Sequence, residues 1–308
     1  MEDICMIRDV LIIGSGPAGL TAAIYLSRGG LKPIIIAGDK PGGQLVNTDV
    51  VENYPGFKSI RGSELMINML TQAEALGTEI VYESTKSISK NRETFCVNLS
   101  SGDSMFSKTI IIATGAKHKR LGISGEEEFT NRGVSWCATC DGPMYKGKKV
   151  AVVGGGNTAA MEAMFLSNFA EEVFLIHRRD KLRADKITQE KLFDKNKIKC
   201  IWNSEVMEIM GKNKLQSIKI KNSTTGGETI LDLDGLFIAI GSVPSSEFAR
   251  DLAPLDEEGY IIAQNTTTIC SGLFAVGDVV SGSLKQAIYA AGQGALAAKY
   301  VEEFLKLR

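Results

Sequence analysis

Residues 9–30, DVLIIGSGPAGLTAAIYLSRGG, decide the fold because they place an apolar strand, a glycine turn and an apolar helix in that order. Gly14, Gly16 and Gly19 give the G-x-G-x-x-G spacing. The first glycine permits the turn, the second lets backbone approach a pyrophosphate, and the third lets the helix pack on the strand. Free amides and the dipole at the helix start favour phosphate. The stretch predicts a dinucleotide-binding unit; the alternative is a glycine turn that serves packing only.

A second copy of the pattern occupies residues 148–168, KKVAVVGGGNTAAMEAMFLSN, and its turn ends in Ala159, a known variant of the motif. Strands that end in glycine turns recur at residues 109–123 and 235–247. Strands alternating with helices predict an α/β protein with parallel sheets.

The nesting of these repeats predicts two Rossmann-like dinucleotide-binding domains, one inserted into the other. The outer, discontinuous domain would comprise residues 1–118 and 247–308, and the inner one residues 119–246. The C-terminal segment, residues 284–307, has helical periodicity, and we expect a helix broken by Gly292 and Gly294.

The ends of the second strands distinguish the two units. In the first unit the strand in KPIIIAGD, residues 32–39, lacks the usual ribose-binding acid at its end, and either Asp39 or the backbone would hold the ribose. In the second unit the strand ends in His177-Arg178-Arg179, with Arg183 one turn later. Guanidinium groups match a 2′-phosphate, so this end predicts NADP(H) rather than NAD(H).

The alternative reading of that basic end is a solvated loop partly neutralised by Asp180 and Asp185. Two units with different strand ends suggest two different dinucleotides, and FAD in the first with NADPH in the second is the natural pairing. Asp278, after the strand of GLFAVGD, could accept hydrogen bonds from the ribityl chain of FAD; otherwise it caps a turn.

Cys137 and Cys140 form a C-x-x-C within SWCATCDG, just before the second unit. Closing so short a loop gains little chain entropy, which makes the disulfide reducible. Half of a zinc site and a pair of inert core thiols are the alternatives. Zinc would need two more ligands, yet the chain has no second C-x-x-C and only two histidines. Asp141 could return a proton to a leaving thiolate, or could simply be a turn residue.

Composition sets wider limits. The 308 residues leave room for about two domains, and the net charge of −1 gives no field for nucleic acid or anionic lipid. We expect no metal, no membrane segment and no export signal, and hence a cytoplasmic protein. The scattered cysteines are expected to be buried thiols: Cys5, Cys96, Cys200 and Cys270.

With these residues in hand, the chain resembles the low-molecular-weight, bacterial-type thioredoxin reductases, within the pyridine nucleotide-disulfide oxidoreductases. The resemblance covers nearly the whole length. It rests on an ordered set of motifs: GSGPAG, GGQL, VENYPG, IIATGA, CATCDG, GGGNTA, HRRDKLRA and GLFAVGD.

The resemblance implies a homodimer whose FAD domain carries an inserted NADPH domain, and a rotation of one domain against the other. It implies that Cys140 faces the flavin, Cys137 attacks the disulfide of thioredoxin, and Asp141 is the general acid. The implied FAD contacts are Gly14, Gly16, Pro17, Ala18, Gly19, Gly42, Gly43, Gln44, Asn53, Asp278, Lys285, Gln286 and Ala287. The implied NADPH contacts are Gly156, Asn157, Thr158, His177, Arg178, Arg179 and Arg183.

Two positions depart from the family pattern. Trp136 precedes the first cysteine, where a small residue is common, and could alter access to Cys137 or contact the partner. Lys285 stands where arginine is usual, which keeps the charge but loses the guanidinium fork.

The expected reaction runs from NADPH through FAD to the Cys137–Cys140 disulfide and then to thioredoxin. One rival is a related flavin enzyme, such as a ferredoxin-linked reductase or an oxidase of small dithiols, and the basic strand end argues against both. The other is a non-catalytic nucleotide-binding redox sensor or structural protein, against which the dithiol and its neighbouring acid weigh.

Overall fold

The computed structural model describes residues 6–39 and 41–307 and contains two compact units. Unit 1 comprises Met1–Lys117 and Val243–Arg308, and unit 2 comprises His118–Ser242. The chain passes between them inside two short strands that pair with each other, β7 (Ala116–His118) and β16 (Ser242–Pro244). The division thus falls within these strands, slightly before the boundaries expected from sequence.

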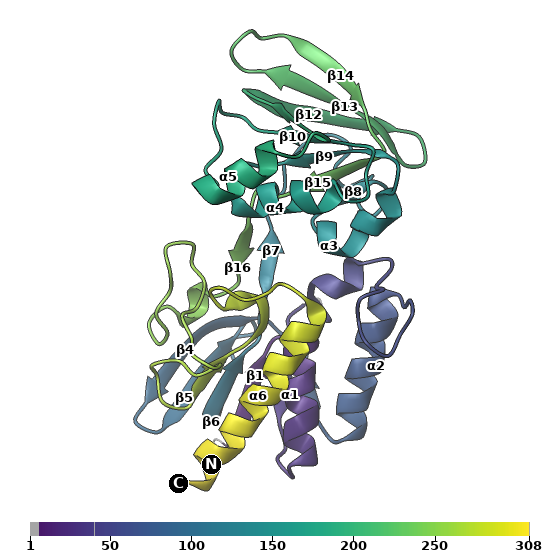
Figure 1. The fold of residues 1–308 in the computed structure, drawn as a ribbon. Coiled ribbons are helices and arrows are strands. Elements are labelled where there is room, and N and C mark those ends of the chain that lie inside the picture. Colours follow the sequence, from purple (N-terminus) through teal and green to yellow (C-terminus); the bar gives the residue numbers. More distant parts are fainter. Residues whose placement is uncertain (1–5, 40, 308) are drawn as a thin grey trace. The chain divides into compact units, whose positions relative to one another are not determined.

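Unit 1 is built on one sheet in the order β3-β2-β1-β6-β5-β4, with β17 paired to β6 (Figure 1). Strands β1, β2, β3, β6 and β17 are parallel, whereas β5 runs antiparallel to both of its neighbours, β4 and β6. Their bounds are β1 Ile7–Ile13, β2 Ile34–Ile36, β3 Glu79–Val81, β4 Thr85–Asn91, β5 Thr94–Leu99, β6 Ser104–Ile112 and β17 Leu273–Ala275.

Three helices lie side by side on one face of this sheet: α1 (Pro17–Arg28), α2 (Gly62–Ala75) and α6 (Ala287–Lys306) (Figure 1). Val10 and Ile12 of β1 pack beneath them, while Leu11 and Ile13 enter the core of the opposite face. Burial on both faces explains why residues 10–13 of β1 form a continuous apolar run rather than an alternating one.

The turn from β1 to α1 requires glycine at two positions, because a side chain there would collide with backbone. Gly14 has a φ of +112°, and a Cβ there would overlap the Ala113 carbonyl oxygen. A Cβ at Gly19 would overlap the carbonyl oxygen of Gly14. Glycine removes both clashes, so the helix starts directly against the strand end.

Helix α6 is continuous, and the expected break at Gly292 and Gly294 is wrong. Gly294 instead brings α6 against α1, because a Cβ at this position would overlap the Ala18 carbonyl oxygen. Gly292 faces open space on the same helix. Close packing against α1 compensates for the low helix propensity of glycine.

Unit 2 contains a parallel sheet in the order β11-β10-β9-β15-β8 and a separate antiparallel sheet in the order β12-β13-β14. The strands are β8 Val134–Ser135, β9 Lys149–Val153, β10 Glu172–Ile176, β11 Ile198–Ile201, β12 Ser204–Gly211, β13 Leu215–Asn222, β14 Glu228–Asp232 and β15 Gly235–Ile238. The helices are α3 Ala138–Asp141, α4 Asn157–Leu166 and α5 Lys186–Phe193.

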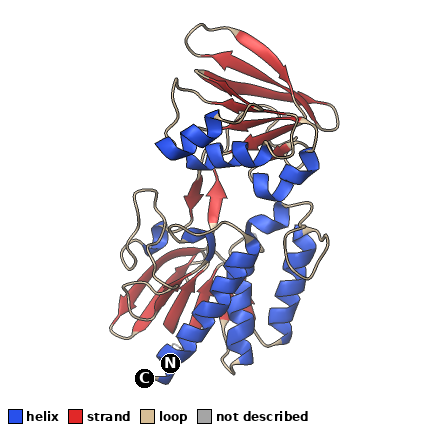
Figure 2. Cartoon of the chain, in the orientation of Figure 1, coloured by secondary structure: helices blue, strands red, loops and turns tan. Residues whose placement is uncertain are grey.

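Helices and strands of each unit form separate layers (Figure 2). In unit 2, Val150 and Val152 of β9 pack with α4, whereas Ala151 and Val153 join the core beneath β12 and β13. Short 3₁₀ turns complete the chain: η1 Gly43–Asn47, η2 Gly142–Tyr145, η3 Glu247–Ala249 and η4 Gly277–Val279. The α/β fold with two Rossmann-like sheets is as predicted.

The α1–α6 contact gives a stability test with an internal control. Gly294→Ala should lower the free energy of unfolding by about 1–3 kcal/mol, because the new methyl group overlaps backbone of α1. Gly292→Ala, on the same helix, should raise it by about 0.5–1 kcal/mol through helix propensity alone. Urea unfolding followed by circular dichroism measures both, and equal shifts of one sign would contradict the close-packing explanation.

Candidate active site

Cys137 and Cys140 form a disulfide across the short helix α3, with their Cα atoms 5.3 Å apart. The Cys137 carbonyl oxygen accepts the amides of Cys140 at 3.2 Å and Asp141 at 3.1 Å. The Cys140 amide also lies 3.2 Å from Cys137 Sγ. Both cysteines are half-buried. The predicted redox pair is therefore a pre-folded turn with a partly accessible sulfur pair.

Ser135, two residues before Cys137, connects the pair to Asp141. The Cys137 amide donates to Ser135 Oγ at 3.0 Å, and the Ser135 hydroxyl also hydrogen-bonds the Asp141 side chain. Burial raises the pKa of Asp141, and the Ser135 hydrogen bond opposes that rise. A raised pKa keeps the carboxyl protonated to higher pH than an exposed aspartate, as a proton donor requires.

Two further titratable groups beside the pair were not predicted from the sequence. Tyr145 has its pKa raised to about 12, first by burial and then by the charges of Asp141 and Asp234. Burial raises the pKa of Glu162, on α4, to about 7, while a hydrogen bond from the Ala138 amide opposes the rise. Glu162 lies in an apolar helical stretch, where its single charge was the only available signal.

Trp136 packs against the chain just after the first crossing between the units. Its ring stacks on His118 at 6.0 Å between centroids, and the Arg120 guanidinium lies 5.9 Å from it. Trp136 Nε1 donates to the Lys119 carbonyl oxygen at 3.3 Å. The side chain thus ties the residue before Cys137 to residues 118–120; contact with a protein partner stays a prediction.

In unit 1 the first glycine loop contacts a second one. The Ser15 hydroxyl donates to the Ala37 carbonyl oxygen at 3.1 Å and accepts the Gly42 amide at 3.0 Å. A Cβ at Gly43 would lie 3.4 Å from Gly16 Cα, whereas a Cβ at Gly16 would meet no atom within 4 Å. Gly16 is therefore open on its outer side, where a phosphate would approach.

Other predicted residues of unit 1 meet around the same loops. Asn53 Nδ2 donates to Gln286 Oε1 at 3.1 Å, and Gln286 precedes Ala287, the first residue of α6. Gln44 Nε2 donates to the Ala116 carbonyl oxygen at 3.3 Å. Asn53 and Gln286, which are far apart in the sequence, thus meet just before the start of α6.

Pro17 and Ala18 open α1, which has no side-chain cap. A Cβ at Gly277, next to Asp278, would lie 3.2 Å from Ala18 Cβ, so the predicted ribityl-binding acid follows a turn packed on α1. Burial raises the pKa of Asp278, and the charge of Lys285 opposes the rise.

Lys285, one of the two departures from the family pattern, donates to the Tyr260 hydroxyl at 2.8 Å. Its ammonium also lies 4.8 Å from the centre of the Tyr260 ring. The structure therefore gives the lysine a local partner that needs no guanidinium fork. Asp39 lies exposed just after β2. Whether Asp39 or the backbone holds the ribose of the dinucleotide bound by unit 1 stays a prediction.

In unit 2 the second glycine turn packs on the basic strand end. A Cβ at Gly155 would overlap the His177 ring, which is 6% exposed. Burial lowers the pKa of His177, followed by the charges of Arg183 and Arg179. His177 Nε2 has no partner among the described residues. The buried imidazole therefore packs against the glycine turn, and its contact with a phosphate stays a prediction.

The arginines themselves are exposed and available. No ion pair between described residues involves Arg178, Arg179 or Arg183. Asp185 is occupied elsewhere, since its carboxylate accepts the Thr188 amide at 2.7 Å and hydroxyl at 2.9 Å and so caps α5. This geometry favours a binding loop over a loop neutralised by its own acids.

The start of α4 has the same open character as that of α1. Gly156 would place a Cβ within 4 Å of no atom, and the helix has no side-chain cap. Asn157 Oδ1 accepts the Asp185 amide at 2.8 Å, which joins the helix start to the basic segment, and Thr158 is exposed in the first turn.

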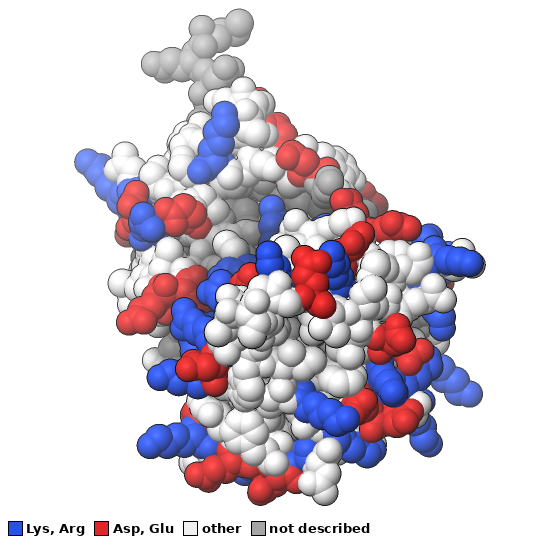
Figure 3. Space-filling view, turned by 90° about the horizontal axis from the view of Figure 1, so that it is seen from above, with Lys and Arg blue, Asp and Glu red and all other residues white. Residues whose placement is uncertain are grey.

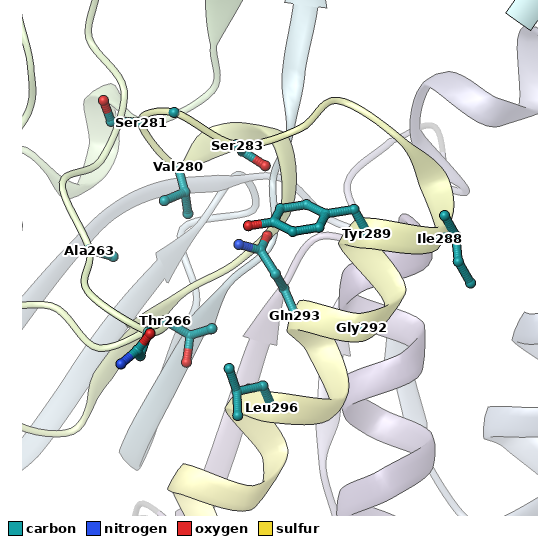
Figure 4. A pocket seen from close by; sticks show the side chains of 12 residues that line it. Ala263, Thr266, Val280, Ser281, Ser283, Ile288, Tyr289, Gly292, Gln293 and Leu296 are labelled. Carbon is teal, nitrogen blue, oxygen red and sulfur yellow. The ribbon is translucent and has the colours of Figure 1, made fainter. Parts of the chain in front are cut away.

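A pocket of about 420 Å³ in unit 1 lies apart from these predicted contacts (Figure 4). Gln293 and Tyr289 of α6 point into it, opposite the segment Val280–Ser283. Gln293 Oε1 accepts the Gly277 amide at 2.7 Å. None of Asp278, Lys285, Gln286 and Ala287 lines this pocket.

Three of the remaining cysteines lie within the described residues. Cys96, Cys200 and Cys270 are free and half-buried rather than fully buried, and Cys5 lies outside the described residues. Within residues 6–39 and 41–307, no group of three or more His, Cys, Asp or Glu side chains could hold a metal ion.

In that same part of the chain, no helix has the length and apolarity needed to cross a bilayer. On the face shown in Figure 3, acidic and basic side chains of the described residues are interspersed.

Comparison with known proteins agrees with this site. Residues 8–294 match the family described as pyridine nucleotide-disulphide oxidoreductase. The chain is 46% identical over 303 residues to the thioredoxin reductase of Streptomyces coelicolor, covering 97% of this chain and 94% of that protein. It is 47% identical over 302 residues to that of Rickettsia conorii, covering 96% and 97% respectively.

Among solved structures, that of thioredoxin reductase from Streptococcus pyogenes matches with a TM-score of 0.94 at 42% identity, covering 99% of this chain and 100% of that one. The family match and the full-length relatives both extend through the strand–turn–helix units and the disulfide turn described above. The chain therefore belongs to the pyridine nucleotide-disulphide oxidoreductase family.

Proposed function

We propose that this chain is an NADPH-dependent thioredoxin reductase that uses FAD to reduce its Cys137–Cys140 disulfide. The observation that carries the proposal is this disulfide, placed beside a half-buried acid with a raised pKa in a chain with two dinucleotide-type glycine turns. Relatives of similar length are named thioredoxin reductase, which supports thioredoxin as the substrate.

Unit 1 has features that suit FAD. Gly16 is open at the uncapped start of α1, where free amides would receive the pyrophosphate. The half-buried Asp278 and the Asn53–Gln286 pair supply polar groups near the start of α6. These residues, with Gly42, Gly43 and Gln44 alongside, are the proposed FAD contacts.

Unit 2 has features that suit NADPH. The open Gly156 and the uncapped start of α4 would receive its pyrophosphate. Arg178, Arg179 and Arg183 are the proposed contacts of the 2′-phosphate, because their guanidinium groups are exposed and free of ion pairs with described residues.

The bound cofactors would carry the hydride and electron chemistry, and the protein would orient the reacting groups. The reduced pair then acts by thiol–disulfide exchange. Cys137 as thiolate attacks one sulfur of the thioredoxin disulfide, forming a mixed disulfide and releasing the other sulfur as thiolate. Cys140 then attacks Cys137 Sγ, which restores the Cys137–Cys140 bond and releases the second thioredoxin sulfur. Asp141 donates the proton that a leaving thiolate needs.

The proposal includes two points that follow from the resemblance. We expect a homodimer in solution and a cytoplasmic location, where reducing systems keep thiols reduced. Sedimentation of the purified protein tests the first point, and fractionation of the host cell tests the second.

Replacing the attacking sulfur should separate catalysis from cofactor binding. Cys137→Ser should abolish NADPH-dependent reduction of thioredoxin because no mixed disulfide can form. The absorption spectrum of bound flavin should be unchanged. Cys200→Ser, at a free thiol in the same unit, is the matched control and should retain activity. Thioredoxin reduction by the Cys137→Ser enzyme would overturn the proposal.

The basic strand end should determine the choice of nucleotide. The double variant Arg178→Ala/Arg179→Ala should raise KM for NADPH by at least about a hundredfold, since each charge-assisted hydrogen bond contributes about 1.5–3 kcal/mol and two are lost. KM for NADH should stay the same, because NADH lacks the 2′-phosphate. Arg132→Ala, an exposed arginine of the same unit, should change neither value. Parallel losses with both nucleotides would argue against a 2′-phosphate site.

Asp141 should control the alkaline side of the pH profile. Asp141→Asn should slow thioredoxin reduction by about a hundredfold, the scale of general acid catalysis, with KM for NADPH unchanged.

Burial raises the pKa of Asp141, so the folded state favours the protonated form, and activity that needs the proton should fall as pH rises through this pKa. The variant should lose that fall. Asp232→Asn, on exposed β14, is the control, and an unchanged pH profile in Asp141→Asn would exclude the acid role.

A further inference from the structure

Glu162 is a half-buried acid that the proposed mechanism does not use. It projects from α4 toward α3, and its carboxyl accepts a hydrogen bond from the Ala138 amide. Its other oxygen, Oε2, is buried and has no partner among the described residues. Ala138 is itself fully buried and packs with Ala159 and Ala163, the small residues through which α3 approaches α4.

Ala138 directly follows Cys137, so its amide belongs to the peptide group that also contains the Cys137 carbonyl. That carbonyl accepts the amides of Cys140 and Asp141. On the other side of Cys137, its own amide donates to Ser135 Oγ at 3.0 Å. The backbone around the attacking cysteine is therefore held at both of its peptide groups, by Ser135 before it and by Glu162 after it.

We infer that Glu162 is a positioning residue of the redox pair: by holding the Ala138 amide, it keeps the Cys137–Cys140 turn folded when the disulfide is reduced. The inference rests on the proposed function for its catalytic consequence. Reduction removes the covalent link, and the turn then depends on hydrogen bonds alone to keep the two Cα atoms near their 5.3 Å separation. A turn that stays folded can form the Cys137–Cys140 disulfide again without the entropic cost of first ordering the chain.

A stability argument supports this role. Burial raises the pKa of Glu162 from 4.5 to about 7, and a carboxyl with an unpartnered oxygen is unfavourable in an apolar helix contact. An apolar side chain of similar volume would remove that penalty. Since the folded pKa is the higher one, the additional cost of ionising this carboxyl is absent below pH 4.5 and grows to its full size above about pH 7. Glu162 therefore destabilises the fold at the pH at which a cytoplasmic enzyme works.

Two substitutions that nearly conserve the side-chain volume of Glu162 distinguish the effect of the hydrogen bond from the effect of packing. Glu162→Gln keeps an acceptor oxygen for the Ala138 amide, whereas Glu162→Met removes it. Glu171→Gln and Glu171→Met, at an exposed glutamate beyond α4, are the matched controls. Thermal unfolding at pH 8 checks folding, and Glu162→Met should melt at a higher temperature than the parent protein.

The direct test is the equilibrium of the holoenzyme with glutathione. In it, the Cys137–Cys140 dithiol and oxidised glutathione give the intramolecular disulfide and two reduced glutathione molecules. Alkylation followed by mass spectrometry measures the cysteine state and does not depend on flavin or thioredoxin. Loss of a hydrogen bond to a charged group should lower the equilibrium constant for disulfide formation by about tenfold in Glu162→Met. Glu162→Gln and both Glu171 variants should stay near the parent value.

Turnover gives the second measurement. Glu162→Met should lower kcat for thioredoxin reduction while leaving KM for NADPH unchanged, and Glu162→Gln should retain kcat. An unchanged equilibrium constant in Glu162→Met would overturn the inference, as would an equal loss in Glu162→Gln. If thioredoxin is not the substrate, the parent enzyme also fails in the turnover assay, while the glutathione comparison still decides the role of Glu162.

Discussion

The close approach of backbone to backbone at two glycine turns is the constraint on which the rest of the structure depends. A Cβ at Gly14 would overlap the Ala113 carbonyl oxygen, and one at Gly154 would overlap the Ala239 carbonyl oxygen. Each clash involves the end of a neighbouring strand, β6 in unit 1 and β15 in unit 2. Only without side chains at these turns can the following helix begin beside the sheet edge with its amides open.

The redox turn depends on a different balance, between burial and hydrogen bonding. Asp141 and Glu162 both have raised pKa values because burial outweighs the hydrogen bonds they receive. Ser135 and the Ala138 amide are those partners, and both lie within the Cys137 neighbourhood. The same polar contacts that set the protonation of the acids therefore also hold the backbone of the cysteine turn.

Much of the fold could be predicted because its signals are local. The apolar run, glycine spacing and helix periodicity of residues 9–30 all lie within one stretch, and the same holds for residues 148–168. The cysteine spacing is also local, since C-x-x-C spans a single helical turn. The continuity of α6 was predicted wrongly because Gly294 is explained only by Ala18 of another helix, far away in the sequence.

The sequence by itself determined the fold class, the nested repeat, the redox pair and the basic strand end, because each follows from residue type at fixed short spacing. Only the tertiary structure decided how buried the acids are and which groups they meet. It placed the His177 ring against Gly155, where burial lowers the pKa of the imidazole. It also showed Lys285 hydrogen-bonded to Tyr260, and Glu162 accepting the Ala138 amide. These contacts join separate elements, and the pKa of a carboxyl or imidazole depends on the surroundings that folding creates rather than on neighbours in the chain.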